Sequence, residues 1–198
     1  MKDLVTADDV RALPPGGELC TSAGAVVTPW AWEIAATRGV RIVLGAAEAK
    51  RCQVAVGSDH GGYALKEQVK THLTRLGYPF HDFGTFSAEP VDYPDVALAV
   101  ARSVQAGASR YGILVDGAGI GSSMAANKVR GIRAALCVDA GAARNSREHN
   151  DANVLTLGAN WVDGGRMREI VEVFLSAECT EARHIRRVKK ITSIEEAG

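Results

Sequence analysis

Cysteine, net charge and long apolar runs are all scarce in this sequence. Its four cysteines (Cys20, Cys52, Cys137 and Cys179) lie far apart and have no CxxC spacing. We therefore expect neither a disulfide framework nor a zinc site, but reduced thiols in a cytoplasmic protein. Twenty-three basic residues balance twenty-three acidic ones, so no overall field attracts nucleic acid or an anionic membrane. No apolar run approaches the length of a membrane span, and neither partner is expected.

Residues 1–50 differ in pattern from the rest of the chain. Thr6 and Asp9 have the spacing of a capping box and predict a short first helix. Thr28 directly before Pro29 predicts a second helix, with a short strand after it. These residues are expected to form a small N-terminal α/β extension.

From residue 51 to residue 198, short apolar runs alternate with segments of helical spacing. The expected strands are 53–56, 79–83, 111–115, 132–137 and 154–157, and the expected helices are 63–76, 94–105, 122–128, 140–149 and 166–177. Such alternation predicts a five-stranded parallel sheet with helices on both faces, an α/β sandwich. Because ligands of these sheets bind at the carboxyl ends of the strands, the active residues should lie at that edge.

Three polar clusters follow the predicted strands. Asp59 and His60 come after the first strand, and Asp116 begins a Gly-rich loop after the third. His149 and Asn150 end the helix that follows the fourth. We expect all three clusters at the same sheet edge. The Gly-rich loop consists of Gly117, Ala118, Gly119, Ile120 and Gly121.

The chemistry of these clusters is that of proton transfer beside an anion. Gly-rich loops that lead into a helix bare backbone N–H groups for anionic oxygens, although such a loop is equally compatible with a plain tight turn. A lone histidine is more often structural than catalytic. An acid/base pair next to an oxyanion-stabilising loop, however, is what proton abstraction beside a carbonyl requires.

Five stretches carry a resemblance to a known family. VAVGSDHGGYALK, DFGTFSAEPVDYPD, GAGIGSSMAANKVRGIRAALC, SREHNDANVLTLGA and RHIRRVKKI occur in order over residues 52–191. Together they resemble the type B ribose-5-phosphate isomerases and the related galactose-6-phosphate isomerase subunits. The resemblance implies a Rossmann-like sandwich, a homodimer or dimer of dimers whose sites take residues from both subunits, and no metal or organic cofactor.

The resemblance also implies roles for individual residues. Asp59, His60 and Tyr93 would line a sugar-phosphate pocket, and the backbone of Gly117 to Gly121 would stabilise an enediolate. His149 would open the furanose ring, with Asn150 beside it holding a hydroxyl. Arg183 and Arg187 would bind the phosphate from the partner subunit. The alternative for these two arginines is a solvated face of the last helix.

The sequence departs from the family at the residue that takes the C2 proton. Most members have a cysteine at the position of Asp116, and another branch has a glutamate at the position of Ser122. Two interpretations of Asp116 are open: it is the general base in the cysteine's place, or it only caps the following loop. Ala118 replaces a hydroxyl residue, and Asn160 stands where one branch has a phosphate-binding arginine.

Two further questions are left open by the sequence. Residues 22–40 look like short segments on enzymes of bacterial microcompartments, which favours either a shell-associated location or a structural arm on the dimer. The predicted reaction is the aldose–ketose isomerisation of ribose 5-phosphate. Its rivals are isomerisation of a six-carbon sugar phosphate and a non-catalytic sugar-phosphate-binding or scaffold role.

Overall fold

The computed structural model describes residues 4–21, 24–44 and 54–196. The chain forms two compact units, Met1–Cys52 and Gln53–Gly198. The predicted boundary between residues 50 and 51 falls within 45–53, outside the described residues.

The N-terminal unit begins with the predicted capping box. Asp9 Oδ2 accepts hydrogen bonds from both the backbone N–H and the hydroxyl of Thr6, each at 2.9 Å. The Thr28 hydroxyl accepts from the N–H of Ala31 at 3.2 Å and caps the second helix. Four short strands form two parallel pairs, β1 with β3 and β2 with β4. The elements are β1 (Leu4–Val5), α1 (Ala7–Arg11), β2 (Glu18–Thr21), β3 (Val26–Val27), α2 (Pro29–Arg38) and β4 (Arg41–Leu44).

The larger unit contains the predicted five-stranded sheet. Its strands are β5 (Val54–Ser58), β6 (Phe80–Asp82), β7 (Tyr111–Asp116), β8 (Ala134–Leu136) and β9 (Val154–Gly158). All pairs are parallel, and the order across the sheet is β6-β5-β7-β9-β8. Chain order reverses direction between β5 and β7, which makes the carboxyl end of these two strands the expected ligand crevice.

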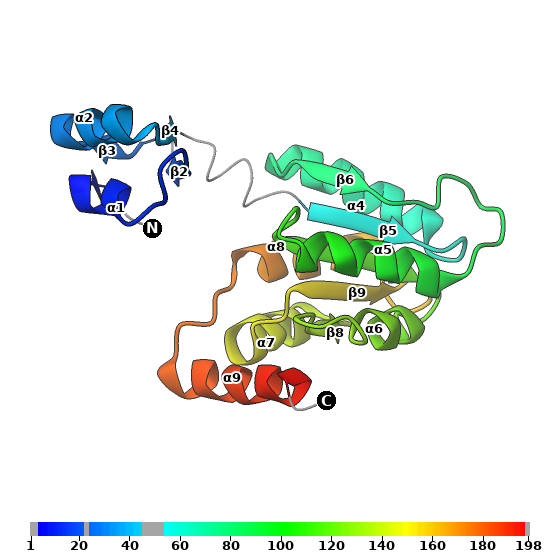
Figure 1. The fold of residues 1–198 in the computed structure, drawn as a ribbon. Coiled ribbons are helices and arrows are strands. Elements are labelled where there is room, and N and C mark those ends of the chain that lie inside the picture. The colour runs from blue at the N-terminus through cyan, green and yellow to red at the C-terminus, as the bar shows by residue number, and fades with distance from the viewer. Residues whose placement is uncertain (1–3, 22–23, 45–53, 197–198) are drawn as a thin grey trace. The chain divides into compact units, whose positions relative to one another are not determined.

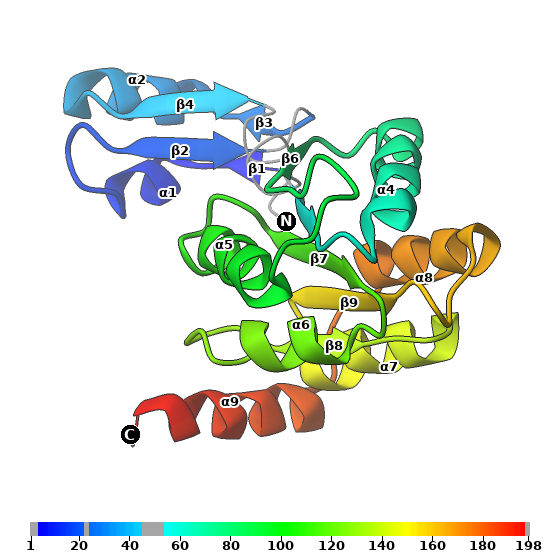
Figure 2. The same ribbon diagram turned by 90° about the vertical axis from the view of Figure 1, so that its right-hand side faces the viewer.

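Helices cover both faces of this sheet, as the sequence predicts (Figures 1 and 2). They are α4 (Tyr63–Leu76), α5 (Tyr93–Gln105), α6 (Ile120–Ala126), α7 (Ala140–Asn150), α8 (Gly164–Ser176) and α9 (Ala182–Glu196). Helices α5 and α6 pack on one face, whereas α4, α7 and α8 pack on the other. Helix α9 packs on α7. Among the described residues, none of the helices is both long and apolar enough to span a bilayer.

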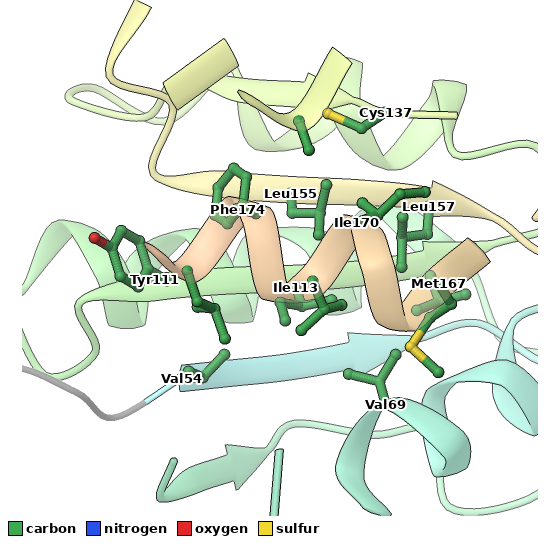
Figure 3. Packing of buried hydrophobic residues seen from close by; sticks show 14 of the residues in the cluster. Val54, Val69, Tyr111, Ile113, Cys137, Leu155, Leu157, Met167, Ile170 and Phe174 are labelled. Atoms are coloured by element: carbon green, nitrogen blue, oxygen red, sulfur yellow. The ribbon is translucent and has the colours of Figure 1, made fainter. Parts of the chain in front are cut away.

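Alternating strand residues feed two separate cores. Val54 and Ile113 point to the face that carries α8, where Phe174 and Ile170 are fully buried (Figure 3). Their neighbours on the same strands point to the face of α5 and α6. Burial on both faces explains why these strands read as continuous apolar runs, and it fixes β5 and β7 as the rigid support of the loops that follow them.

Candidate active site

The loops after β5 and β7 meet at the carboxyl edge of the sheet. Asp59 Oδ1 accepts from the N–H of Gly62 at 2.9 Å and closes the first loop. Gly62 has no room for a side chain, because a Cβ there would lie 2.1 Å from the carbonyl oxygen of Val115. A Cβ on Gly61 would lie 3.5 Å from the Gly117 nitrogen. The glycines therefore let the Asp59 loop lie directly against the Gly-rich loop.

The carboxylate of Asp116 is turned into the Gly-rich loop. Its Oδ1 accepts from the N–H groups of Ala118, at 2.8 Å, and of Gly119. Its Oδ2 accepts from the N–H of Ser122 at 3.0 Å, and the residue is only 4% exposed. Gly119 has φ of 74°, in the left-handed region that favours glycine. Two of the amides expected to face a substrate anion are thus engaged by the protein's own carboxylate.

Two predicted pocket residues join this edge. Tyr93 lies over the first turn of α6, since a Cβ on Gly121 would come within 2.6 Å of its ring. His60 is exposed, and its Nδ1 accepts from the N–H of Val91 at 3.4 Å. The structure therefore brings Asp59, His60, Tyr93 and the Gly-rich loop together, as the sequence predicts.

The loop after β9 completes the same edge. The N–H of Asn160 donates to the Gly117 carbonyl at 2.9 Å, and its amide side chain lies beside Gly117. A Cβ on Gly158 would be 2.5 Å from Trp161, so this exposed indole packs on the strand end. The sequence reading named Asn160 only as a departure and overlooked Trp161, although both follow directly on a predicted strand.

His149 and Asn150 do not lie at this edge, and the prediction that they would is wrong. Helix α7 runs antiparallel to the strands, so its last residues return to their amino ends. Asn153, just beyond the helix, accepts from the N–H of Gly112 at 2.9 Å near the start of β7. Arg147 donates to the hydroxyl of Tyr111, the first residue of β7, at 3.0 Å.

The second cluster combines α7 with α9. The imidazole of His149 stacks on that of His184, with centroids 4.1 Å apart and planes 7° apart. Asn145 contacts His149 Nδ1 at 3.0 Å. A cavity of about 340 Å³ opens here and is lined by His149, His184 and Arg183 among others. Arg183 and Arg187 are both exposed. His184 had not been predicted, although it lies inside the RHIRR motif that carries these arginines.

Electrostatics in the second cluster favour the neutral form of His184, because they lower its pKa. Burial lowers the pKa of His184, and the adjacent His149 and the guanidiniums of Arg183 and Arg187 lower it further. The buried Nδ1 of His184 has no hydrogen-bond partner among the described residues. The cavity also carries Glu148, Glu178 and Glu181 on its wall, so the charge of Arg183 is offset there by carboxylates.

The two clusters are too far apart to act on one small molecule within a single chain. Asp116 ends β7 and Tyr111 begins it, and five steps of about 3.3 Å separate them by roughly 16 Å. The two clusters therefore lie at opposite edges of the sheet, and we refer to the Asp116 cluster as the first half-site and to the His149 cluster as the second.

A buried ion pair braces the loop that leads from β6 to Tyr93. The Lys66 side chain is fully buried, and its Nζ donates to both oxygens of Asp82 at 2.8 and 2.9 Å. It also donates to the Thr85 carbonyl at 2.6 Å. Burial alone would raise the pKa of Asp82, but the hydrogen bonds from Lys66 and Lys70 outweigh it and lower that pKa. Nothing in the sequence pattern predicts this buried ion pair.

Within the described part of the chain, no three His, Cys, Asp or Glu side chains gather as metal ligands would.

The profile of the ribose/galactose isomerase family matches residues 54–191. Ribose-5-phosphate isomerase B of Escherichia coli is 43% identical over 144 residues, which are 73% of this chain and 97% of that protein. The solved ribose-5-phosphate isomerase B of Clostridium thermocellum is 49% identical with a TM-score of 0.72, covering 73% of this chain and 98% of that one. That of Mycoplasma genitalium, with bound ribulose 5-phosphate, is 38% identical with a TM-score of 0.70, covering 74% and 97%.

Proposed function

Because this chain belongs to the ribose/galactose isomerase family, we propose that it interconverts ribose 5-phosphate and ribulose 5-phosphate through an enediolate. It is an enzyme, a sugar-phosphate isomerase of the type B class. The observation that carries the proposal is the buried carboxylate of Asp116, held by three backbone N–H groups at the head of the Gly-rich loop, which itself lies against the Asp59 loop. A relative crystallised with ribulose 5-phosphate supports this choice of substrate.

Asp116 is the proton carrier in this reaction. Three backbone donors hold its carboxylate in one orientation. Oδ2 accepts only one of these hydrogen bonds, from Ser122, which leaves a lone pair for a substrate proton. The carboxylate takes the proton from C2 and returns it to C1, and a second proton passes from O2 to O1. The C1 carbonyl thereby becomes a hydroxyl, and the C2 hydroxyl becomes the carbonyl. The amides of Gly117, Ile120 and Gly121, which Asp116 does not engage, face the enediolate oxygens.

The second half-site opens the ring and binds the phosphate. His149 moves a proton between O1 and the ring oxygen, and Asn150 holds a hydroxyl. Arg183 and Arg187 bind the phosphate through their forked donors. Asp59, His60 and Tyr93 hold the sugar at the first half-site.

Each complete site needs two copies of the chain. The roughly 16 Å between the half-sites exceeds the reach of one pentose phosphate, so the His149 cluster of one copy serves the Asp116 cluster of another. This supports a homodimer as the smallest active form, with a dimer of dimers as the larger possibility. Mixing Asp116→Asn chains with His149→Gln chains tests it. Each parent should be nearly inactive, and co-refolded mixtures should regain about a quarter of wild-type activity; no recovery would contradict a shared site.

The general base is tested by three variants at one position. Asp116→Asn keeps one acceptor oxygen but cannot take a proton, and should lower kcat by about 10²–10⁴-fold. Asp116→Cys restores the thiol usual in the family and should recover part of that loss. Asp139→Asn is the matched control, since Asp139 also caps a helix, by accepting from Ala142 at 2.7 Å, but lies outside both half-sites. Ribose 5-phosphate and an aldohexose 6-phosphate should be assayed side by side, because greater turnover of the hexose would replace the proposed substrate.

The same contacts favour a second candidate function. In this candidate Asp116 acts only as a cap, because its carboxylate engages the loop amides itself, and the chain binds sugar phosphate without turning it over. This binding role would be established if the wild-type protein binds ribose 5-phosphate without converting it and Asp116→Cys gains activity. The same result would show that Asp116 is not a general base. Wild-type-like turnover in Asp116→Asn would contradict the base as well.

The N-terminal unit is proposed to associate the enzyme, within the cytoplasm, with a bacterial microcompartment shell. Trp30 and Trp32 are 56% and 45% exposed, although Arg11 lies 4.5 Å over the Trp30 ring. Exposed indoles of this kind suit a protein partner. Replacing both by Ala should abolish co-purification with shell proteins and leave turnover unchanged. Unchanged co-purification would contradict this role, and loss of the dimer would favour a structural arm.

A further inference from the structure

A polar groove lies between α4 and α8, away from both half-sites. It encloses about 210 Å³ and is lined by Gln68, Thr71, His72, Arg75 and Arg168. This volume is below the usual range of drug-sized pockets and suits a compact group such as a phosphate.

The groove carries an excess of positive charge. Arg75 and Arg168 face it from the two helices. Within the described residues, the Arg168 guanidinium makes no ion pair, and Arg75 has only Glu172 at 3.7 Å. Glu172 is half-exposed, so its carboxylate can turn toward water when an anion arrives.

His72 adds a buried donor. Its side chain is 2% exposed, and Nδ1 lies 3.1 Å from the Arg75 guanidinium. Since a guanidinium can only donate, Nδ1 accepts and Nε2 carries the proton. Nε2 is 3.2 Å from Glu172 but is not aligned for a hydrogen bond to any described residue. Burial, and then the guanidiniums of Arg75 and Arg168, lower the pKa of His72, whereas Glu172 and the Arg168 carbonyl act to raise it.

Gln68 completes the set. A Cβ on Gly164 would lie 2.2 Å from Gln68 Oε1, so only a glycine at the start of α8 leaves space for this side chain. Thr71 donates its hydroxyl to the Glu67 carbonyl at 3.0 Å and can only accept inside the groove. The remaining polar groups that face the groove are therefore mostly donors.

We propose that the groove between α4 and α8 is a binding site for a compact phosphate-bearing anion, separate from the substrate site. The two guanidiniums bind the phosphate oxygens from opposite helices, and His72 Nε2 with the Gln68 amide donate to the same group. Charged guanidinium pairs are the donors that proteins use for phosphate.

Imidazole nitrogen signals of the full-length protein test the site directly. Inorganic phosphate is titrated against ¹⁵N-labelled protein at constant ionic strength, with chloride as the comparison anion. The His72 signals, assigned with His72→Gln, should shift and saturate with phosphate but not with chloride. Arg168→Gln should weaken this binding at least about tenfold. Glu172→Gln should strengthen it by about fivefold, because it removes a like charge.

Matched variants distinguish this site from the phosphate-binding arginines of the second half-site, Arg183 and Arg187. Arg166→Gln, on the same helix but outside the groove, should leave the His72 titration unchanged, as should Arg187→Gln. The proposal is overturned if the His72 signals do not respond, respond equally to chloride, or respond as in wild type when Arg168 is replaced. If the signals of His149 and His184 do not shift in the same titration, this would count only against the proposed phosphate binding by Arg183 and Arg187.

Discussion

Replacing Asp82 by Asn should destabilise the protein more than replacing Lys66 by Met, although both changes break the same ion pair. The reason is what each change leaves behind. Without the Asp82 carboxylate, the fully buried Lys66 ammonium keeps one neutral amide oxygen at position 82, the Thr85 carbonyl at 2.6 Å and Glu67 at 3.4 Å. The rings of Tyr63 and Phe86 lie 5.5 and 5.2 Å from it. Without the ammonium, Asp82 still has Lys70 at 2.7 Å and the N–H of Gly84 at 3.0 Å.

These remaining contacts set the magnitudes. Leaving a buried charge without its partner costs about 3–5 kcal/mol, and we expect Asp82→Asn near the lower end because Glu67 stays within reach. Lys66→Met leaves one carbonyl, that of Thr85, without its donor, and we expect a cost of about 1–2 kcal/mol, in the lower part of the range for an unpaired buried polar group. Lys70→Met is the control: its side chain is 23% exposed, and we expect a cost of about 1 kcal/mol or less.

Urea unfolding measures the difference. With a slope of about 2 kcal/mol per molar urea, the midpoint should fall by roughly 1.5 M in Asp82→Asn and by about 0.5–1 M in Lys66→Met. Circular dichroism and tryptophan fluorescence should be followed together, because the two compact units can unfold separately. Equal losses for the two variants, or a larger loss for Lys66→Met, would refute the reasoning.

Three further predictions concern pH, thiol reactivity and close packing. Because burial and the cationic neighbours lower the pKa of His184 below its ordinary 6.5, the unfolded chain binds the extra proton more readily, and stability should fall as pH drops below 6.5. Urea titrations at several pH values should show that the free energy of unfolding depends less on pH in His184→Gln. Burial raises the pKa of the Cys137 thiol to about 11, so peptide mapping after iodoacetamide at pH 8 should find it unmodified while the less buried Cys179 reacts; equal labelling would contradict this. Gly62→Ala should cost about 1–3 kcal/mol or prevent folding, whereas Gly61→Ala, with 3.4 Å of space, should be nearly neutral in thermal unfolding.

Regular elements could be predicted because their causes are local. The helix Tyr63–Leu76 was predicted with its observed ends, since helical spacing leads directly to Gly77 in the left-handed conformation. The run 132–137 is apolar except for Arg133 and was predicted as a strand, but only Ala134–Leu136 pairs with β9, because a turn with Gly131 at φ 80° precedes it. The two-residue strands β1 and β3 were missed because they are too short to show a period.

The candidate site was predicted in part. The contact between Asp59 and the Gly-rich loop could be predicted, because each directly follows a strand and the two strands are parallel neighbours in the sheet. The prediction failed for His149, which closes a helix and so lies at the opposite edge. The contacts of Asp116 with three amides depend on side-chain orientation, which no spacing in the sequence records.

A carboxylate at position 116 also changes what the cell can do to this loop. A thiolate there would be open to alkylation, glutathione capping and oxidation to sulfenic acid, whereas Asp116 has no sulfur to lose to an electrophile or to peroxide. The loop should therefore keep its chemistry under oxidative stress and in the presence of reactive aldehydes, conditions in which a thiol-dependent relative would be inactivated.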